Sequence, residues 1–281
     1  MHSDGAHTGT RRSGWRRVMM SFVLIVASVY GLLVLAGLFL ADRLMFLPQP
    51  SSYADDARIV KLTSADGATL SARLDRNPAA TFTILFSHGN AEDMGQLDEL
   101  FDGFKRLGFS VAAYDYSGYG TSSGRPTARG AVANIEAVYD YLTRSAGIAP
   151  ERIIVWGRSV GSGPSAHLAA TRKVGGLVLE SGFVSAFRVM TRIRLLPFDK
   201  FDNLRAVVAL TRPLLVIHGT EDEIIPFWHG RALYERASVP KMHLWVERAG
   251  HNDLAWVAGP AYGETARAFA AMIGKETHEN K

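Results

Sequence analysis

The stretch IIVWGRSVGSG, residues 153–163, joins a strand-like run to a glycine-rich turn around a serine. Four β-forming residues lead into the pattern Gly-Arg-Ser-Val-Gly at 157–161, and a helical pattern follows. A strand that merely ended here would need a single turn residue. Either the glycines only let the strand turn tightly into a helix, or they present the Ser159 hydroxyl as an exposed nucleophile. Residues elsewhere in the chain decide between these two interpretations.

Strand-like and helical segments alternate on both sides of this stretch. The strand-like segments are IVKLTS (59–64), TLSARLD (69–75), TFTILFSHG (81–89), SVAAYDYS (110–117), RIIVWGRS (152–159), GGLVLES (175–181), PLLVIHG (213–219) and MHLWVER (242–248). Several are apolar on successive residues, as strands are when helices cover both faces of a parallel sheet. The alternation predicts an α/β fold with a mostly parallel, doubly wound sheet of about eight strands.

Residues 183–210 interrupt the alternation, because this segment is longer than one ordinary crossover between strands. It mixes apolar residues with arginines. Ligands of open α/β sheets bind at the carboxyl ends of the strands, so an insertion placed there would form a lid. Arg188, Met190 and Leu195 are its candidate substrate-contacting residues. The alternative is a surface helix with solvated arginines.

An uncharged apolar run covers residues 18–41. At about 1.5 Å per residue it is long enough to span a bilayer core of about 30 Å. A cleaved signal peptide usually has a shorter apolar region and a small-x-small cleavage site. No Ala-x-Ala precedes Asp42, so the run predicts an uncleaved transmembrane anchor.

The anchor divides the chain into predicted parts. Residues 1–17 form a basic tail, 42–57 a Pro/Ser-rich linker, 58–274 the α/β domain and 275–281 a short C-terminal tail. Four arginines precede the anchor, whereas the first 20 residues after it hold only Arg43 and Arg58. The positive-inside rule therefore predicts a single-pass membrane protein with a cytoplasmic N-terminus and the α/β domain on the outer, extracytoplasmic side.

The charge and cysteine content exclude several classes of function. The formal charge of +4 lies mostly in the N-terminal arginines, so the remaining chain has no basic excess for binding nucleic acid. The chain has no cysteine, which removes disulfides, a thiolate nucleophile and zinc–thiolate sites. No set of His, Asp and Glu has the spacing of metal ligands, so we expect neither a metal nor another cofactor.

A serine nucleophile needs a base, and the base needs an orienting carboxylate. The strand-like segment 213–219 is followed by Asp222, and the segment 242–248 is followed by His251. Both side chains would share the carboxyl edge of the sheet with Ser159, so we predict His251 as general base and Asp222 as its orienting acid. The flanking Glu221 and Glu223 are the main alternatives for the acid, and Asp253 is a further one.

An oxyanion hole needs two backbone N–H groups beside the serine. The residue after the nucleophile, Val160, supplies one, and the loop SHGNAED (87–93) after the third strand supplies the other at Asn90. His88 in that loop is expected to be a structural hydrogen-bonding residue, not a catalytic one. Asp115 is likewise expected to brace its loop.

Several adjoining motifs now resemble one family. The segments SHGNAED, YDYSGYGTSSGRPT, GRSVGS, HGTEDEIIPFWHGRALYERA and LWVERAGHND together resemble the α/β-hydrolase superfamily, over roughly residues 44–273. Within it they are similar to the membrane-associated branch that contains the α/β-hydrolase-domain protein depalmitoylases. That resemblance implies a Ser159–Asp222–His251 triad and hydrolysis of a long-chain acyl thioester on a protein. Those relatives reach the cytosolic membrane face through a cysteine-rich N-terminus, whereas this chain has no cysteine.

The sequence thus predicts a membrane-anchored serine hydrolase that cleaves an ester or thioester through an acyl-enzyme. Its predicted partners are a lipid-like acyl substrate or an acylated protein, and membrane lipid. A serine peptidase or aminopeptidase of the same fold is one alternative, with Asp199 or Asp202 holding a substrate amine. A non-catalytic, hydrolase-like membrane binding protein is the other alternative.

Overall fold

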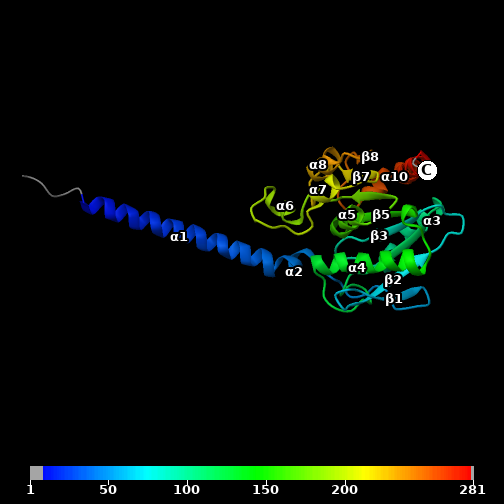
Figure 1. The fold of residues 1–281 in the computed structure, drawn as a ribbon, viewed down its shortest axis with the longest axis horizontal. Helices are drawn as coiled ribbons and strands as arrows, with labels where there is room; N and C mark the ends of the chain where they lie inside the picture. Colours follow the sequence, from blue (N-terminus) through cyan, green and yellow to red (C-terminus); the bar gives the residue numbers. More distant parts are fainter. Residues whose placement is uncertain (1–8, 280–281) are drawn as a thin grey trace, which may run out of the picture. The chain divides into compact units, whose positions relative to one another are not determined.

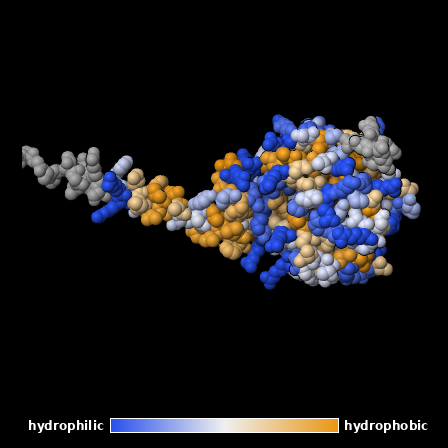
Figure 2. Space-filling model, in the orientation of Figure 1, coloured by the Kyte–Doolittle hydropathy of each residue, from blue (hydrophilic) through white to orange (hydrophobic). Residues whose placement is uncertain are grey.

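The computed structural model describes residues 9–279. This part of the chain divides into two compact units between Leu44 and Met45. The first unit is built on helix α1 (Gly9–Phe39). Its segment Gly14–Phe39 is long and apolar enough to cross a membrane, with a mean hydropathy of 2.6 over its most apolar window. Figure 2 shows this contrast, because hydrophilic residues next to the grey atoms give way to a run of hydrophobic ones.

Helix α1 also covers part of the predicted basic tail. Residues 1–8 of that tail lie outside the described part of the chain, and residues 9–17 belong to the helix. The helical span therefore begins earlier than the predicted anchor at 18–41. A short helix, α2 (Ala41–Met45), follows it.

The second unit contains one eight-stranded sheet in the order β1-β2-β4-β3-β5-β6-β7-β8. In Figure 1, β1 and β2 lie at one side of this unit and β7 and β8 at the other. The strands are β1 (Ile59–Thr63), β2 (Thr69–Asp75), β3 (Thr83–Ser87), β4 (Ser110–Tyr114), β5 (Ile153–Arg158), β6 (Gly176–Glu180), β7 (Leu214–Gly219) and β8 (Lys241–Val246). β1 and β2 pair antiparallel, as do β2 and β4. All pairs from β4 to β8 are parallel. The predicted α/β fold is confirmed.

Helices and short helical turns connect these strands. The α-helices are α3 (Asp98–Arg106), α4 (Ala128–Asp140), α5 (Ser162–Thr171), α6 (Ala186–Thr191), α7 (Asn203–Val208), α8 (Trp228–Arg236), α9 (Leu254–Ala258) and α10 (Pro260–Glu279). The turns are η1 (Met94–Leu97), the π-helical η2 (Tyr141–Ser145), η3 (Pro150–Arg152) and η4 (Ser159–Gly161).

Two apolar cores lie on opposite faces of the sheet. Alternate residues of the central strands belong to different cores, as Val155 and Trp156 of β5 illustrate. Helices α4, α5, α7 and α8 contribute to the core with Val155, whereas α3, α9 and α10 contribute to the core with Trp156. Because successive side chains of a strand point to opposite faces, continuous apolar strands such as β5 and β7 are buried on both sides.

The parallel pairing places four strand ends at one edge of the sheet. Ser159 directly follows β5, and the loop with Asn90 follows the neighbouring strand β3. Asp222 follows β7, and His251 follows the adjacent β8. Since parallel strands end on the same side, the predicted site residues meet at the carboxyl edge.

Two predicted boundaries differ from the structure. The segment 42–57, expected to be a linker, begins inside α2, and Phe46 is buried against Tyr116 and Tyr119. An aromatic side chain next to an apolar surface gains free energy by burial, which composition alone did not reveal. The expected tail 275–281 also begins within α10, which continues to Glu279.

Segment 183–210 contains α6 and α7 joined by a long loop. Its second half packs on α5, because the ring of Phe201 fills the space beside Gly163 and Asn203 Nδ2 donates to Ser162 Oγ at 3.1 Å. The end of α6 and the loop after it expose apolar side chains, with Met190 of α6 86% and Ile193 of the loop 63% accessible.

Candidate active site

The turn after β5 holds Ser159 in a left-handed backbone conformation, with φ of +53°. Few residues other than glycine adopt this region, and it recurs where a functional side chain is held under strain. A Cβ at Gly161 would overlap the carbonyl oxygen of Ser87, and a Cβ at Gly157 would lie 2.7 Å from the Cα of Ser162. Both glycines are therefore required for the close backbone approach that forms this turn.

Ser159, His251 and Asp222 form a continuous hydrogen-bonded line. Ser159 Oγ lies 3.0 Å from His251 Nε2, and His251 Nδ1 lies 2.8 Å from Asp222 Oδ2. The Asp222 side chain is fully buried, whereas Ser159 is partly exposed. In this geometry the imidazole can accept a proton from the hydroxyl while the carboxylate stabilises the resulting imidazolium.

The surroundings of Asp222 keep it ionised. Its Oδ1 accepts the backbone N–H groups of Ile224 and Ile225 at 3.0 and 2.7 Å. Although burial opposes ionisation, hydrogen bonds from His218 and His251 hold the pKa of Asp222 well below its ordinary value. An ionised carboxylate is the form that can fix the His251 tautomer.

The competing carboxylates lie elsewhere. Glu223 Oε2 accepts the backbone N–H of His251 at 3.3 Å, and Asp253 Oδ1 accepts that of Gly250 at 2.7 Å. The side chain of Glu221 is exposed. Of the acid candidates that the sequence left open, only Asp222 hydrogen-bonds the imidazole ring within the described residues.

The loop after β3 runs directly beside the serine. A Cβ at Gly89 would lie 3.6 Å from Ser159 Cβ, so the backbone at Gly89 lies close to the serine. The Asn90 side chain is turned away, since its Oδ1 accepts Leu47 N–H at 2.8 Å and Tyr119 O–H at 2.7 Å. Val160 lies at the start of η4, where N–H groups have no helical partner. The loop that carries Asn90 and the turn that carries Val160 thus lie next to Ser159, and the role of their N–H groups as oxyanion donors stays a prediction.

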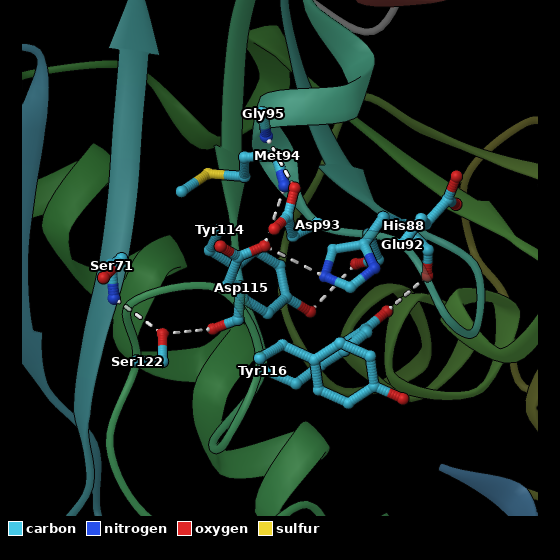
Figure 3. A network of polar contacts seen from close by, with 12 residues as sticks. Ser71, His88, Glu92, Asp93, Met94, Gly95, Tyr114, Asp115, Tyr116 and Ser122 are labelled. Carbon is cyan, nitrogen blue, oxygen red and sulfur yellow. Dashed lines mark hydrogen bonds and ion pairs between the residues drawn. The ribbon is translucent and has the colours of Figure 1, made fainter. Parts of the chain in front are cut away.

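A network of buried polar contacts holds the loop after β3 in place, as Figure 3 shows. His88 Nε2 lies 3.3 Å from Asp115 Oδ1, and Tyr116 Oη donates to the His88 carbonyl at 2.8 Å. Burial disfavours the imidazolium, but the hydrogen bond and charge of Asp115 raise the pKa of His88. Asp115 also accepts Met94 N–H at 2.9 Å. Both residues support the loop and make no contact with Ser159.

Arg158 has a partner that the sequence alone did not identify. Its guanidinium forms an ion pair with Glu92, with Nε donating to Oε1 at 3.2 Å. The same Glu92 Oε1 accepts the backbone N–H of Gly89 at 2.5 Å. The residue next to the serine is therefore linked through Glu92 to the loop that carries Asn90. The motif GRSVG carries a positive charge and GNAED carries negative ones, but nothing in either motif predicts that Arg158 pairs with Glu92.

The segment before β1 braces the same loop. Ser52 N–H donates to Asp93 Oδ2 at 2.7 Å, and Tyr53 Oη donates to Asp115 Oδ2 at 2.6 Å. The expected linker is thus a part of the scaffold around Asn90. Tyr53 follows two prolines and two serines, and this local sequence has no periodicity that would predict its contact with Asp115.

The three lid candidates do not contact the Ser159–His251–Asp222 line. Met190 is 86% and Leu195 49% accessible, and Arg188 lines a cavity between α6 and α7. Over the described residues, no group of three or more His, Cys, Asp and Glu side chains has the arrangement of a metal site.

Comparison with protein families identifies one sequence profile, described as "Serine aminopeptidase, S33", that matches residues 78–201. Human alpha/beta hydrolase domain-containing protein 17B is 45% identical over 203 residues, which cover 71% of this chain and 69% of the human protein. Mouse alpha/beta hydrolase domain-containing protein 17C is 43% identical over 181 residues, which cover 63% of this chain and 56% of that protein.

Solved structures share the fold at low sequence identity. The Pyrococcus furiosus esterase Pf2001 superposes with a TM-score of 0.66 at 19% identity, over 80% of this chain and 99% of the esterase. A hydrolase from Pseudomonas aeruginosa superposes with a TM-score of 0.58 at 19% identity, over 77% of this chain and 99% of that one. These similarities establish the α/β-hydrolase fold of residues beyond the anchor segment.

Proposed function

The chain belongs to the α/β-hydrolase family, in the group of the alpha/beta hydrolase domain-containing proteins 17, and we propose that it is a membrane-anchored serine hydrolase of acyl esters or thioesters. Ser159 is the nucleophile, His251 the general base and Asp222 the orienting acid. The backbone N–H groups of Asn90 and Val160 bind the oxyanion.

The reaction proceeds in two acyl transfers. Ser159 Oγ attacks the substrate carbonyl and gives its proton to His251 Nε2, and the oxyanion develops between the Asn90 and Val160 N–H groups. His251 then protonates the departing alcohol or thiol, which leaves an acyl-enzyme. Water then gives a proton to the same imidazole and attacks the acyl carbonyl, and the imidazolium returns that proton to Ser159 Oγ as the acid leaves.

One observation carries this proposal: Ser159 has φ of +53° and its Oγ lies 3.0 Å from His251 Nε2. The test is hydrolysis of a p-nitrophenyl ester by Ser159→Ala, which we expect to fall by about 10⁶-fold in kcat. Ser165→Ala is the matched control, since this buried hydroxyl has no hydrogen-bond partner within the described residues. If Ser159→Ala hydrolysed the ester with the wild-type kcat, the assignment of Ser159 as nucleophile would be wrong.

A fluorophosphonate probe separates an enzyme from a hydrolase-like binding protein. Such a probe reacts with an activated serine but not with an ordinary one. We expect labelling of the wild-type chain and of Ser165→Ala, and none of Ser159→Ala. Folded wild-type protein that stays unlabelled would favour the binding protein.

The substrate class rests on α6 and the loop that follows it. Exposed Met190 and Leu195 beside Arg188 would suit a long acyl chain next to a polar headgroup. An acyl-chain series of esters, thioesters and amides, with Ser159→Ala as blank, tests this. Met190→Ser and Leu195→Ser should shift the preference toward shorter chains, and an unchanged profile would remove these residues from substrate binding.

The description of the matching family profile raises an aminopeptidase as the second candidate. That activity needs a carboxylate free to hold a substrate ammonium. Asp199 Oδ1 accepts Phe187 and Lys200 N–H groups, and Asp202 Oδ1 accepts that of Arg205 at 3.0 Å. Both carboxylates line a cavity shared with four arginines, which would repel an ammonium. Amide substrates in the same series decide between the two.

A further inference from the structure

A cavity of about 280 Å³ opens between α6, α7 and the end of α8. Four arginines line it, and we call it the arginine cavity: Arg188 of α6, Arg194 of the following loop, Arg205 of α7 and Arg236 of α8. None of its lining residues belongs to the Ser159–His251–Asp222 line. It is therefore a feature separate from the candidate active site.

The two carboxylates in the cavity do not neutralise these arginines. Asp199 accepts Phe187 N–H at 3.1 Å and Lys200 N–H at 2.8 Å, and Asp202 caps α7. None of the four guanidinium groups forms an ion pair with any residue in the described range 9–279. Four positive and two negative groups leave the lining with an excess of positive charge, which a bound anion would offset.

A buried hydroxyl supplies a second, independent feature. Ser185, which precedes α6, is 3% accessible and lines the arginine cavity. Its Oγ has no hydrogen-bond partner within the described residues. Since a buried polar group without a partner costs free energy, a ligand oxygen that accepts from Ser185 would stabilise this site.

The end of α6 and the loop after it expose three large apolar side chains beside the cavity. Met190 is 86%, Ile193 63% and Leu195 49% accessible, and they lie within the same segment as Arg188 and Arg194. Guanidinium groups bind phosphate oxygens in paired, charge-assisted hydrogen bonds. An exposed apolar rim next to such groups matches an amphiphile that carries a phosphate.

We propose that the arginine cavity binds a phosphate group, presented by an anionic phospholipid whose acyl chains contact Met190, Ile193 and Leu195. The guanidinium groups hold the phosphate oxygens, and Ser185 Oγ donates one further hydrogen bond. The site shares Arg188, Met190 and Leu195 with the proposed substrate-binding segment, but lipid binding there does not require the Ser159 hydroxyl. Ser159→Ala should therefore bind the lipid as the wild type does.

The test measures binding to the full chain in detergent micelles by titration calorimetry. The probes are dihexanoyl phosphatidylglycerol, dihexanoyl phosphatidylcholine and inorganic phosphate. We expect saturable binding of phosphatidylglycerol and much weaker binding of the zwitterionic lipid. Tighter binding of phosphatidylglycerol than of phosphate identifies lipid as the source, and equal binding identifies free phosphate. Either result supports a phosphate site.

The decisive variant is Arg205→Gln with Arg236→Gln, which we expect to weaken phosphatidylglycerol binding by about tenfold or more. The matched control is Arg144→Gln with Arg231→Gln, because these arginines pair with Asp140 and Glu235 on exposed helix surfaces. Met190→Ser with Ile193→Ser should weaken lipid binding but leave phosphate binding unchanged.

A salt series keeps the proposal testable if the double variant is poorly folded. Wild-type affinity for phosphatidylglycerol should fall as sodium chloride rises, because charge pairing is screened. Absence of saturable binding to every probe, affinity that is unaffected by salt, or equal binding by wild type and a folded Arg205→Gln, Arg236→Gln variant would overturn the proposal.

Discussion

Arg158 and Glu92 form an ion pair beside the candidate nucleophile, and Glu92 also accepts the backbone N–H of Gly89. The pair joins the turn after β5 to the loop after β3, which carries Asn90. An oxyanion site works only when its N–H groups are held in place before the charge develops. We therefore regard Arg158 and Glu92 as positioning residues for the oxyanion loop.

The first prediction follows from this link. Glu92→Ala should lower kcat for a p-nitrophenyl ester by about tenfold to a hundredfold with little change in KM, because a displaced loop weakens binding of the transition state more than of the ester. Glu92→Gln should retain more activity, since its amide oxygen can still accept Gly89 N–H.

The control for this prediction is Arg152→Gln, an exposed arginine at the opposite end of β5. Arg158→Gln should follow Glu92→Ala in kcat, and the double variant should be no worse than either alone if the two act as one unit. Wild-type kcat in Glu92→Ala would contradict the positioning role.

The second prediction separates the three neighbouring carboxylates. Asp222→Asn should reduce kcat by about 10⁴-fold, because the amide favours the wrong tautomer of His251. Glu221→Gln should keep wild-type kcat. Glu223→Gln should lose less than about tenfold, since it removes charge near a backbone N–H only. Steady-state kinetics on one ester measures all three. A severe loss of kcat in Glu221→Gln would mean that Asp222 is not the only acid that orients His251.

The third prediction concerns the glycine that closes the turn. Gly161→Ala should lower the free energy of unfolding by about 3 kcal/mol or more, because its Cβ would overlap the Ser87 carbonyl oxygen. Gly274→Ala is the control, since that helical position has open space and alanine should add about 0.5–1 kcal/mol. Urea unfolding of the chain in detergent measures both. Equal free energies of unfolding for the two variants would show that Gly161 does not pack closely against the Ser87 carbonyl.

The fourth prediction concerns a buried histidine. Burial, followed by the nearby charge of His218, lowers the pKa of His229 to about 4. The folded state thus favours neutral His229, and its contribution to stability is present above the unfolded value of about 6.5 and is lost as the pH falls toward 4. From about pH 7 to 5 this lowers the free energy of unfolding by on the order of 2 kcal/mol.

Urea unfolding at both pH values checks this contribution. His229→Gln should show a smaller pH dependence than the wild type, because it removes the titrating group. The exposed His167→Gln serves as control and should keep the wild-type dependence. If His229→Gln keeps the full pH dependence, another group is responsible for it.

The fifth prediction tests the membrane topology that the arginine distribution favours. Alkaline phosphatase fused after residue 281 should be active in a bacterial host, because the positive-inside rule places the domain outside the cytoplasm. Green fluorescent protein at the same position should stay dark. Replacing the four N-terminal arginines by glutamate should weaken this orientation. A fluorescent, phosphatase-inactive fusion would put the domain in the cytoplasm.

Much of the fold could be predicted because its signals are local. Apolar runs of strand length, separated by helical periodicity, specify a covered parallel sheet wherever they occur along a chain. All eight predicted strands are present. The boundaries were less predictable at residues 42–57, where Phe46 and Tyr53 dock through contacts with Tyr116 and Asp115 far along the chain.

The sequence by itself determined the turn at IIVWGRSVGSG, because two glycines around a serine between a strand and a helix impose one backbone path. It also determined which strand ends carry Asp222 and His251, since strand order and direction follow from the alternation of elements. Only the tertiary structure decided which carboxylate meets the imidazole, what Arg158 binds and where four arginines gather. Those outcomes depend on side chains brought together across the sheet and between helices, and no local pattern encodes such distances.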